Sequence, residues 1–295
     1  VWRRGLANQG WVGFSAIAVD LEGNIYATGS IDDWPGVEMM RRVLPRLVGE
    51  EPFYDFYDKM DYDAFVAKFD REGRLLWLRR APAASPNRDG GLFIALDGEG
   101  SVYITVYTDV VPRNRTRQET TMSLSKLDPA GDELWSVPIA LGERGYLTSM
   151  TVDAQGSIYF AGRVTGLKER GWSDVFVKKL DADGTEVWTT SFGSADGDTL
   201  QAIAVDAVGN VYVAGSTGGE LGGPNMGLYD AILSKFTPAG QHAWTRQIGT
   251  HGNDYGYGVV VDDAGDIYIT ASLRGGCVTG EIEGDTLLLA KYDAQ

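Results

Sequence analysis

A repeated phrase runs through this sequence, and an internal repeat of this length constrains the fold more directly than any other feature. The first copy reads Ala-Val-Asp-Leu-Glu-Gly-Asn-Ile-Tyr and ends at Tyr26. Its aspartate occurs in five copies, at Asp20, Asp97, Asp153, Asp206 and Asp262. A second phrase follows each copy and begins with a lysine, at Lys68, Lys126, Lys179, Lys235 and Lys291. In the first four copies a tryptophan stands nine residues after this lysine, at Trp77, Trp135, Trp188 and Trp244.

Each copy predicts four short strands joined by tight turns. In the fourth copy the expected strands are about 200–206, 210–216, 231–236 and 242–247, all rich in β-branched and aromatic residues. Each Asp-x-x-Gly segment predicts a turn in which the aspartate accepts backbone amides and the glycine supplies a positive φ. The sequence therefore predicts an all-β fold of four-stranded antiparallel blades in a single domain, 1–295. The expected blades are about 13–80 with an insertion at 29–62, 90–138, 145–192, 199–248, and 255–293 together with 1–5.

The two ends of the chain complement each other. The fifth copy stops soon after Lys291 without its tryptophan, whereas the chain begins Val1-Trp2, much as the third copy reads Val187-Trp188. We therefore expect a closed five-bladed β-propeller whose N-terminal strand completes the last blade, because closure removes exposed sheet edges. A longer parent with further copies is the alternative.

The insertion in the first blade contains an apolar pattern with helical spacing. Val37, Met40, Val43, Leu44 and Leu47 recur at this spacing, which predicts one helical insertion. The helix would either pack its apolar stripe on the blades or dock a partner.

The repeated phrases, Val-Asp-x-x-Gly-Asn-x-Tyr and Lys-Leu-Asp-x-x-Gly-x-x-x-Trp, resemble the SBBP repeat family, which is named for seven-bladed β-propellers. The resemblance covers nearly the whole chain, although this chain has five copies. It implies an exported bacterial repeat protein (periplasmic, cell-surface or secreted) without an assigned enzymatic activity. The start at Val1 would follow either from processing after export or from trimming.

Composition excludes several functions. The formal net charge of −15 argues against a nucleic-acid partner, because phosphate repels such a surface. No apolar run approaches the roughly 20 residues of a transmembrane helix. A single cysteine, Cys277, forms no intrachain disulfide, and two histidines, His242 and His251, cannot build a His-rich metal site. We expect no metal and no cofactor.

The variable connections between strands are the expected binding face, because function usually resides in loops on a rigid scaffold. The aromatic candidates, anchors of the kind used in protein and sugar recognition, are Trp11, Trp34, Phe53, Tyr54, Tyr57 and Trp172, joined by Tyr229. A basic loop with Arg113, Arg115 and Arg117 could meet an acidic partner or an anionic glycan. The alternatives are that these aromatics pack over loops and that the arginines have no specific role.

Three aspartates give a catalytic alternative. Asp89, Asp198 and Asp254 each stand eight residues before the repeated aspartate of their blades. A carboxylate pair separated by roughly 5–9.5 Å could support glycoside hydrolysis; capping of loops or a weak cation site would also place them there. We favour a non-enzymatic binding or scaffold module of an exported or cell-surface assembly, which recognises protein or glycan. The alternative is a carbohydrate-active enzyme.

The repeated lysines are expected to pair with the repeated turn aspartates, because a partly buried carboxylate otherwise carries a desolvation penalty. This would be a structural role.

Overall fold

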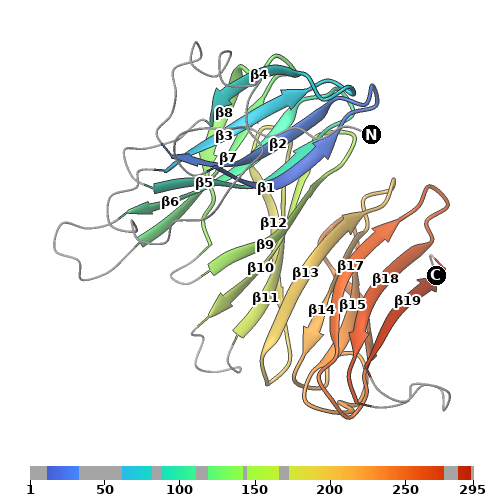
Figure 1. Cartoon of the computed structure of the whole chain (residues 1–295). Coiled ribbons are helices and arrows are strands. Elements are labelled where there is room, and N and C mark those ends of the chain that lie inside the picture. The colour runs from blue at the N-terminus through green and yellow to red at the C-terminus, as the bar shows by residue number, and fades with distance from the viewer. Residues whose placement is uncertain are drawn as a thin grey trace. The chain divides into compact units, whose positions relative to one another are not determined.

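Strands make up the regular structure of the described residues (Figure 1). A computed structural model describes residues 12–32, 62–81, 88–110, 119–141, 145–165, 173–275 and 285–293. The chain divides into two compact units, Val1–Ala140 and Leu141–Gln295, and each is described by itself.

The first unit contains two antiparallel sheets of four strands each. Sheet 1 has the order β1 (Val12–Val19), β2 (Ile25–Asp32), β3 (Tyr62–Phe69) and β4 (Leu75–Arg80). Sheet 2 has the order β5 (Arg88–Leu96), β6 (Val102–Val110), β7 (Glu119–Leu127) and β8 (Glu133–Pro138). Buried side chains from both sheets form one core, including Val66 of β3 and Ile104 of β6.

The second unit contains three antiparallel sheets. Sheet 3 consists of β9 (Gly145–Val152), β10 (Ile158–Thr165), β11 (Ser173–Leu180) and β12 (Glu186–Phe192). Sheet 4 consists of β13 (Asp198–Val205), β14 (Val211–Thr217), β15 (Asp230–Phe236) and β16 (His242–Ile248). Sheet 5 consists of β17 (Tyr255–Val261), β18 (Ile267–Leu273) and β19 (Thr286–Tyr292). Apolar cores lie between sheets 3 and 4 and between sheets 4 and 5.

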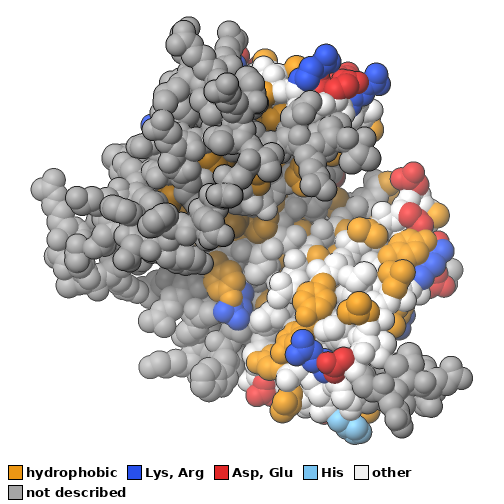
Figure 2. All heavy atoms as spheres, in the orientation of Figure 1, with side chains coloured by type: hydrophobic (Ala, Val, Ile, Leu, Met, Phe, Trp, Pro, Cys, Tyr) orange, Lys and Arg blue, Asp and Glu red, His pale blue; other side chains and the backbone are white. Residues whose placement is uncertain are grey.

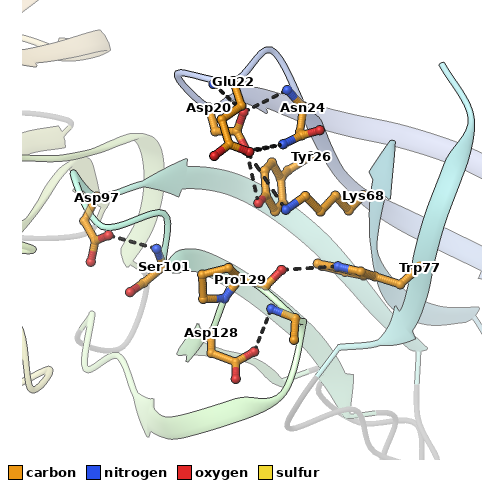
Figure 3. A network of polar contacts seen from close by, with 11 residues as sticks. Asp20, Glu22, Asn24, Tyr26, Lys68, Trp77, Asp97, Ser101, Asp128 and Pro129 are labelled. Atoms are coloured by element: carbon orange, nitrogen blue, oxygen red, sulfur yellow. Dashed lines mark hydrogen bonds and ion pairs between the residues drawn. The ribbon is translucent and has the colours of Figure 1, made fainter. Parts of the chain in front are cut away.

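The repeated turn between the first two strands of each sheet has the predicted chemistry (Figure 3). In sheet 1, Asp20 Oδ1 accepts the amides of Glu22 at 3.1 Å and Asn24 at 2.8 Å, and Gly23 has a φ of 84°. The Tyr26 hydroxyl donates to Asp20 Oδ2 at 3.4 Å. The same tyrosine–aspartate bond recurs in the other four sheets at 3.0–3.1 Å. Each repeat therefore anchors its turn to its own second strand.

The repeated lysines lie over the repeated tyrosines. Their Nζ atoms are 4.7–5.4 Å from the ring centroids in all five sheets, which is cation–π distance. The predicted ion pair with the turn aspartate is confirmed for Lys68–Asp20 at 4.0 Å and for Lys126–Asp97 at 3.5 Å. Lys291 pairs with Asp266 instead, at 2.5 Å. Lys68, Lys126 and Lys291 thus each contact a ring as well as a carboxylate.

The repeated tryptophan joins one sheet to the next within each unit. Trp77 of β4 donates its Nε1–H to the carbonyl of Pro129 at 3.3 Å, in the turn between β7 and β8 (Figure 3). Trp188 of β12 donates in the same way to Pro238 at 3.1 Å. The ring of Trp188 lies so close to Gly240 that a Cβ there would be 2.5 Å from it. We call this arrangement the tryptophan contact.

The predicted fold class is wrong in its closure. The strands form five separate sheets, none of them closed, and the described residues contain no helix. The all-β class is confirmed, and so is the four-strand sheet in four of five cases; sheet 5 has three strands among the described residues. Within each unit, neighbouring sheets meet through buried side chains rather than through ladder hydrogen bonds. The helix predicted from the apolar spacing of residues 37–47 lies outside the described part of the chain. Residues 1–5 and most of the insertion, 33–61, lie outside the described residues.

Candidate functional site

The predicted binding side chains lie outside the described residues, so their role stays a prediction. They are Trp11, Trp34, Phe53, Tyr54, Tyr57, Trp172, Arg113, Arg115 and Arg117. Tyr229 is described, and it belongs to the surface built below.

The three candidate catalytic aspartates are fully buried. Asp198 accepts the amide of Ser194 at 2.7 Å and the hydroxyl of the same residue. Asp254 accepts the amide and hydroxyl of Thr250, at 2.5 and 3.0 Å, and the amide of Arg274 at 2.7 Å. Asp198 and Asp254 therefore cap the loops that precede β13 and β17, as one of the sequence interpretations holds. Asp89 lies in the first unit, on β5.

Two loops of the second unit are joined to each other at the end of the sheets opposite to the Asp-x-x-Gly turns. One loop is 218–229, between β14 and β15, and the other is 249–254, between β16 and β17. The amide of Leu228 donates to the carbonyl of Gly252 at 3.0 Å, and the amide of Asp254 donates to the carbonyl of Tyr229 at 2.6 Å. The Nδ1 of His251 lies 3.3 Å from the carbonyl oxygen of Met226. We call these two loops, together with Tyr255 and Tyr257 of β17, the loop platform.

Glycines allow the platform loops to approach so closely. A Cβ at Gly227 would lie 2.4 Å from the carbonyl oxygen of Thr250 in the other loop. A Cβ at Gly252 would lie 1.6 Å from the carbonyl oxygen of Arg274, at the end of β18. No other residue fits at these contacts without moving backbone, so the close approach of the two loops requires glycine at both positions.

Apolar and aromatic side chains are exposed on this surface. Met226 is 49% exposed, Leu228 is 64% exposed and Tyr257 is 51% exposed. The rings of Tyr229 and Tyr255 are stacked, with centroids 6.1 Å apart and planes at 23°. Hydrophobic side chains are visible over the described part of the second unit in Figure 2. Large exposed apolar side chains on a constrained surface are typical of recognition sites.

The polar side chains beneath the platform bond to its own loops. Asn225 donates to the carbonyl of Gly218 at 2.6 Å and accepts the amide of Gly227 at 2.8 Å. The hydroxyl of Thr217 accepts the amide of Gly219 at 3.1 Å. These bonds define the loop conformation. The exposed side chains of the two loops include Glu220 and His251 beside the apolar Met226 and Leu228.

Sequence reasoning singled out Tyr229 but missed Met226, Leu228 and Tyr257. The available signal was a connection richer in glycine than the corresponding connections. It has no second copy in the chain, so the repeat comparison that identified the turns gave no information about it.

The described ranges contain no group of three or more His, Cys, Asp or Glu side chains that could hold a metal ion. Across the same ranges, no helix is long and apolar enough to cross a membrane.

A comparison with protein families matches two segments of the second unit. Residues 187–222 and 243–272 fit the SBBP family, described as a β-propeller repeat. This part of the chain consists of SBBP repeats. Each SBBP match contains one repeated tryptophan, turn aspartate and tyrosine, namely Trp188, Asp206 and Tyr212 in the first and Trp244, Asp262 and Tyr268 in the second.

The SBBP repeats have distant relatives. Regulatory protein FlaEY of Caulobacter vibrioides is 28% identical in a match of 191 residues, and this match covers 56% of this chain and 20% of FlaEY. The matched region thus spans about a fifth of that relative's length. A crystal structure of a protein of unknown function from Dyadobacter fermentans has a TM-score of 0.53 at 11% identity, covering 93% of this chain and 74% of that one. The apocarotenoid oxygenase of Synechocystis has a TM-score of 0.50 at 10% identity, covering 88% and 56%. At such identities the likeness extends to the fold alone.

Most of loop 218–229 falls between the two SBBP matches, in the interval 223–242.

Proposed function

We propose that this protein is a non-enzymatic binding module that recognises a protein partner through the loop platform. The observation that carries the proposal is the exposure of Tyr257 on β17 and of Met226 and Leu228 on a loop held by backbone hydrogen bonds and glycine contacts. Such loops are ordered before binding, so association costs little conformational entropy. Binding would then gain from the burial of apolar surface, about 25 cal/mol per Å².

A protein partner fits the platform better than a glycan does. Asn225 and Thr217 are engaged with the backbone of their own loop. Recognition of sugar hydroxyls depends on directed polar groups beside an aromatic ring, whereas Met and Leu side chains fit apolar side chains of a protein. A glycan remains the second outcome of the test.

We infer the setting from the family resemblance, which favours a subunit of an exported or cell-surface assembly. Fractionation of cells that express the natural protein tests this directly. Recovery in the cytoplasm alone would contradict the inferred location without bearing on the platform.

Site-specific crosslinking tests the binding function. A photoactivatable residue at position 228 should crosslink one protein species in the native host, whereas the same residue at Val208 should not. Val208 is a matched control because it is 73% exposed and lies in a turn at the other end of sheet 4. A photoactivatable residue at position 226 should form the same crosslink. The double substitution Leu228→Ser with Tyr257→Ser should abolish that crosslink and change the free energy of unfolding by less than about 1 kcal/mol.

Two results would contradict the proposal. The first is the same crosslinked species from positions 228 and 208. The second is binding to a glycan array by the purified chain that the double substitution abolishes, because that would assign the platform to sugars.

A further inference from the structure

A buried carboxylate lies at the root of loop 218–229. Asp230 is the first residue of β15 and is fully buried. It precedes Lys235 by five residues, as Asp63 of sheet 1 precedes Lys68. In sheet 1, Asp63 forms an ion pair with Arg80, which stands three residues after Trp77. The corresponding position in sheet 4, three residues after Trp244, is Gln247.

The side chain of Gln247 both donates and accepts hydrogen bonds, and an arginine could not make the accepted ones. Gln247 Nε2 donates to Asp230 Oδ2 at 2.8 Å and to the carbonyl of Gly219 at 3.0 Å. Its Oε1 accepts the amides of Leu221 at 3.0 Å and Gly222 at 3.1 Å. A guanidinium has donors only, so it would leave both amides without this acceptor. The amide side chain is therefore matched to the backbone of the loop.

Asp230 holds the other end of the same loop. Its Oδ2 also accepts the amide of Met226 at 3.0 Å. Its Oδ1 has no hydrogen-bond partner among the described residues and lies against Gly249, where a Cβ would be 2.0 Å away. A buried carboxylate with an incomplete set of partners is costly. Sheet 1 has a cation, Arg80, at the equivalent position, whereas sheet 4 has the neutral Gln247 there.

We propose that Asp230 and Gln247 are positioning residues that set the conformation of loop 218–229 and thereby present Met226 and Leu228. Sheet 4 exchanges the ion pair of sheet 1 for four hydrogen bonds to the loop backbone, made to Gly219, Leu221, Gly222 and Met226. The consequence for binding rests on the proposed function. The effect on the conformation of loop 218–229 does not rest on the proposed function, because it concerns the free protein.

Gln247→Arg tests the inference by recreating the Asp–Arg pair of sheet 1. Amide hydrogen exchange, followed by NMR on the whole chain, should accelerate at Leu221 and Gly222 by about fivefold or more, since each loses its acceptor. Exchange at Ile232 and Leu233 in β15 should not change, and the melting temperature should not fall. Arg80→Gln is the matched control: it should leave exchange at Leu221 and Gly222 unchanged.

Unchanged exchange at both amides in Gln247→Arg would overturn the proposal. Equal acceleration in β15 would also overturn it, because Gln247 would then act on general stability rather than on the loop. Asp230→Asn supplies a second readout. It keeps the shape of the side chain, so the amide of Met226 should retain its protection from exchange. Loss of this protection together with loss of protection in β15 would count against a local role. A failed crosslinking experiment would leave these exchange results intact, so the two proposals fail separately.

Discussion

Substitution of Gly240 measures the strength of the tryptophan contact, and Gly209 provides the matched control. Both glycines occupy the last position of a tight turn in sheet 4, with φ of 77° at Gly240 and 88° at Gly209. Gly209→Ala should cost only the strain of a left-handed residue, about 1–2 kcal/mol, because its Cβ would meet Pro238 at an ordinary 3.5 Å. Gly240→Ala carries the same strain, and its Cβ would lie 2.5 Å from the ring of Trp188. Forcing extra volume into a packed site costs about 1–3 kcal/mol more, so the total should be about 2–5 kcal/mol.

The assay is urea unfolding of each variant, followed by circular dichroism and tryptophan fluorescence. The excess cost of Gly240→Ala should disappear in a Trp188→Leu background, since the clash partner is then absent. Equal midpoints for Gly209→Ala and Gly240→Ala would refute the reasoning. An excess that persists without Trp188 would refute it as well.

Two further predictions concern the repeated lysine and aspartate positions. Lys126→Met should destabilise the protein by about 1–3 kcal/mol, because Asp97 would remain nearly buried without its cation; Lys291→Met, whose ion pair is more exposed, should cost less than about 1 kcal/mol in the same thermal melts. The free energy of unfolding should also fall in acid because of Asp97. Burial alone would raise the pKa of Asp97, but hydrogen bonds from the Ser101 amide and the Tyr103 hydroxyl hold this pKa below its usual value. The contribution is therefore complete above the unfolded pKa of about 3.9 and is lost as the pH falls through the lower folded pKa. Asp97→Asn should flatten this part of a melting-temperature profile between pH 7 and 2, and an unchanged acid slope would contradict it.

Local chemistry explains how much of the fold could be predicted from the sequence. The expected strands 210–216 and 231–236 correspond to β14 and β15, because a turn aspartate and a glycine fix where each strand begins. The position of the lysine over the tyrosine ring was not predicted, because it depends on side chains from β2 and β3 that become neighbours only in the sheet. Ring closure was inferred from the likeness of Trp2 to Trp188, and sequence likeness gives no information about how sheets are placed.

The candidate site was less predictable than the fold. Asp198 and Asp254 were found by their spacing, but spacing does not distinguish a loop cap from a catalytic group. The platform depends on the close approach of Gly227 to Thr250 and on the long-range bonds of Gln247. These contacts join segments that have no second copy in the sequence, so no repeated pattern predicts them.

The tryptophan contact has a consequence for the order in which the chain acquires its structure. Trp77 completes sheet 1, yet the carbonyl that accepts its Nε1–H belongs to Pro129, 52 residues later in the chain. Trp188 likewise depends on Pro238, 50 residues later. During synthesis, each sheet can therefore pair its strands before its outer edge has been secured, and the following sheet supplies that bond. For sheets 1 and 3, the stability of the outer strand is therefore set partly by sequence that is synthesised after it.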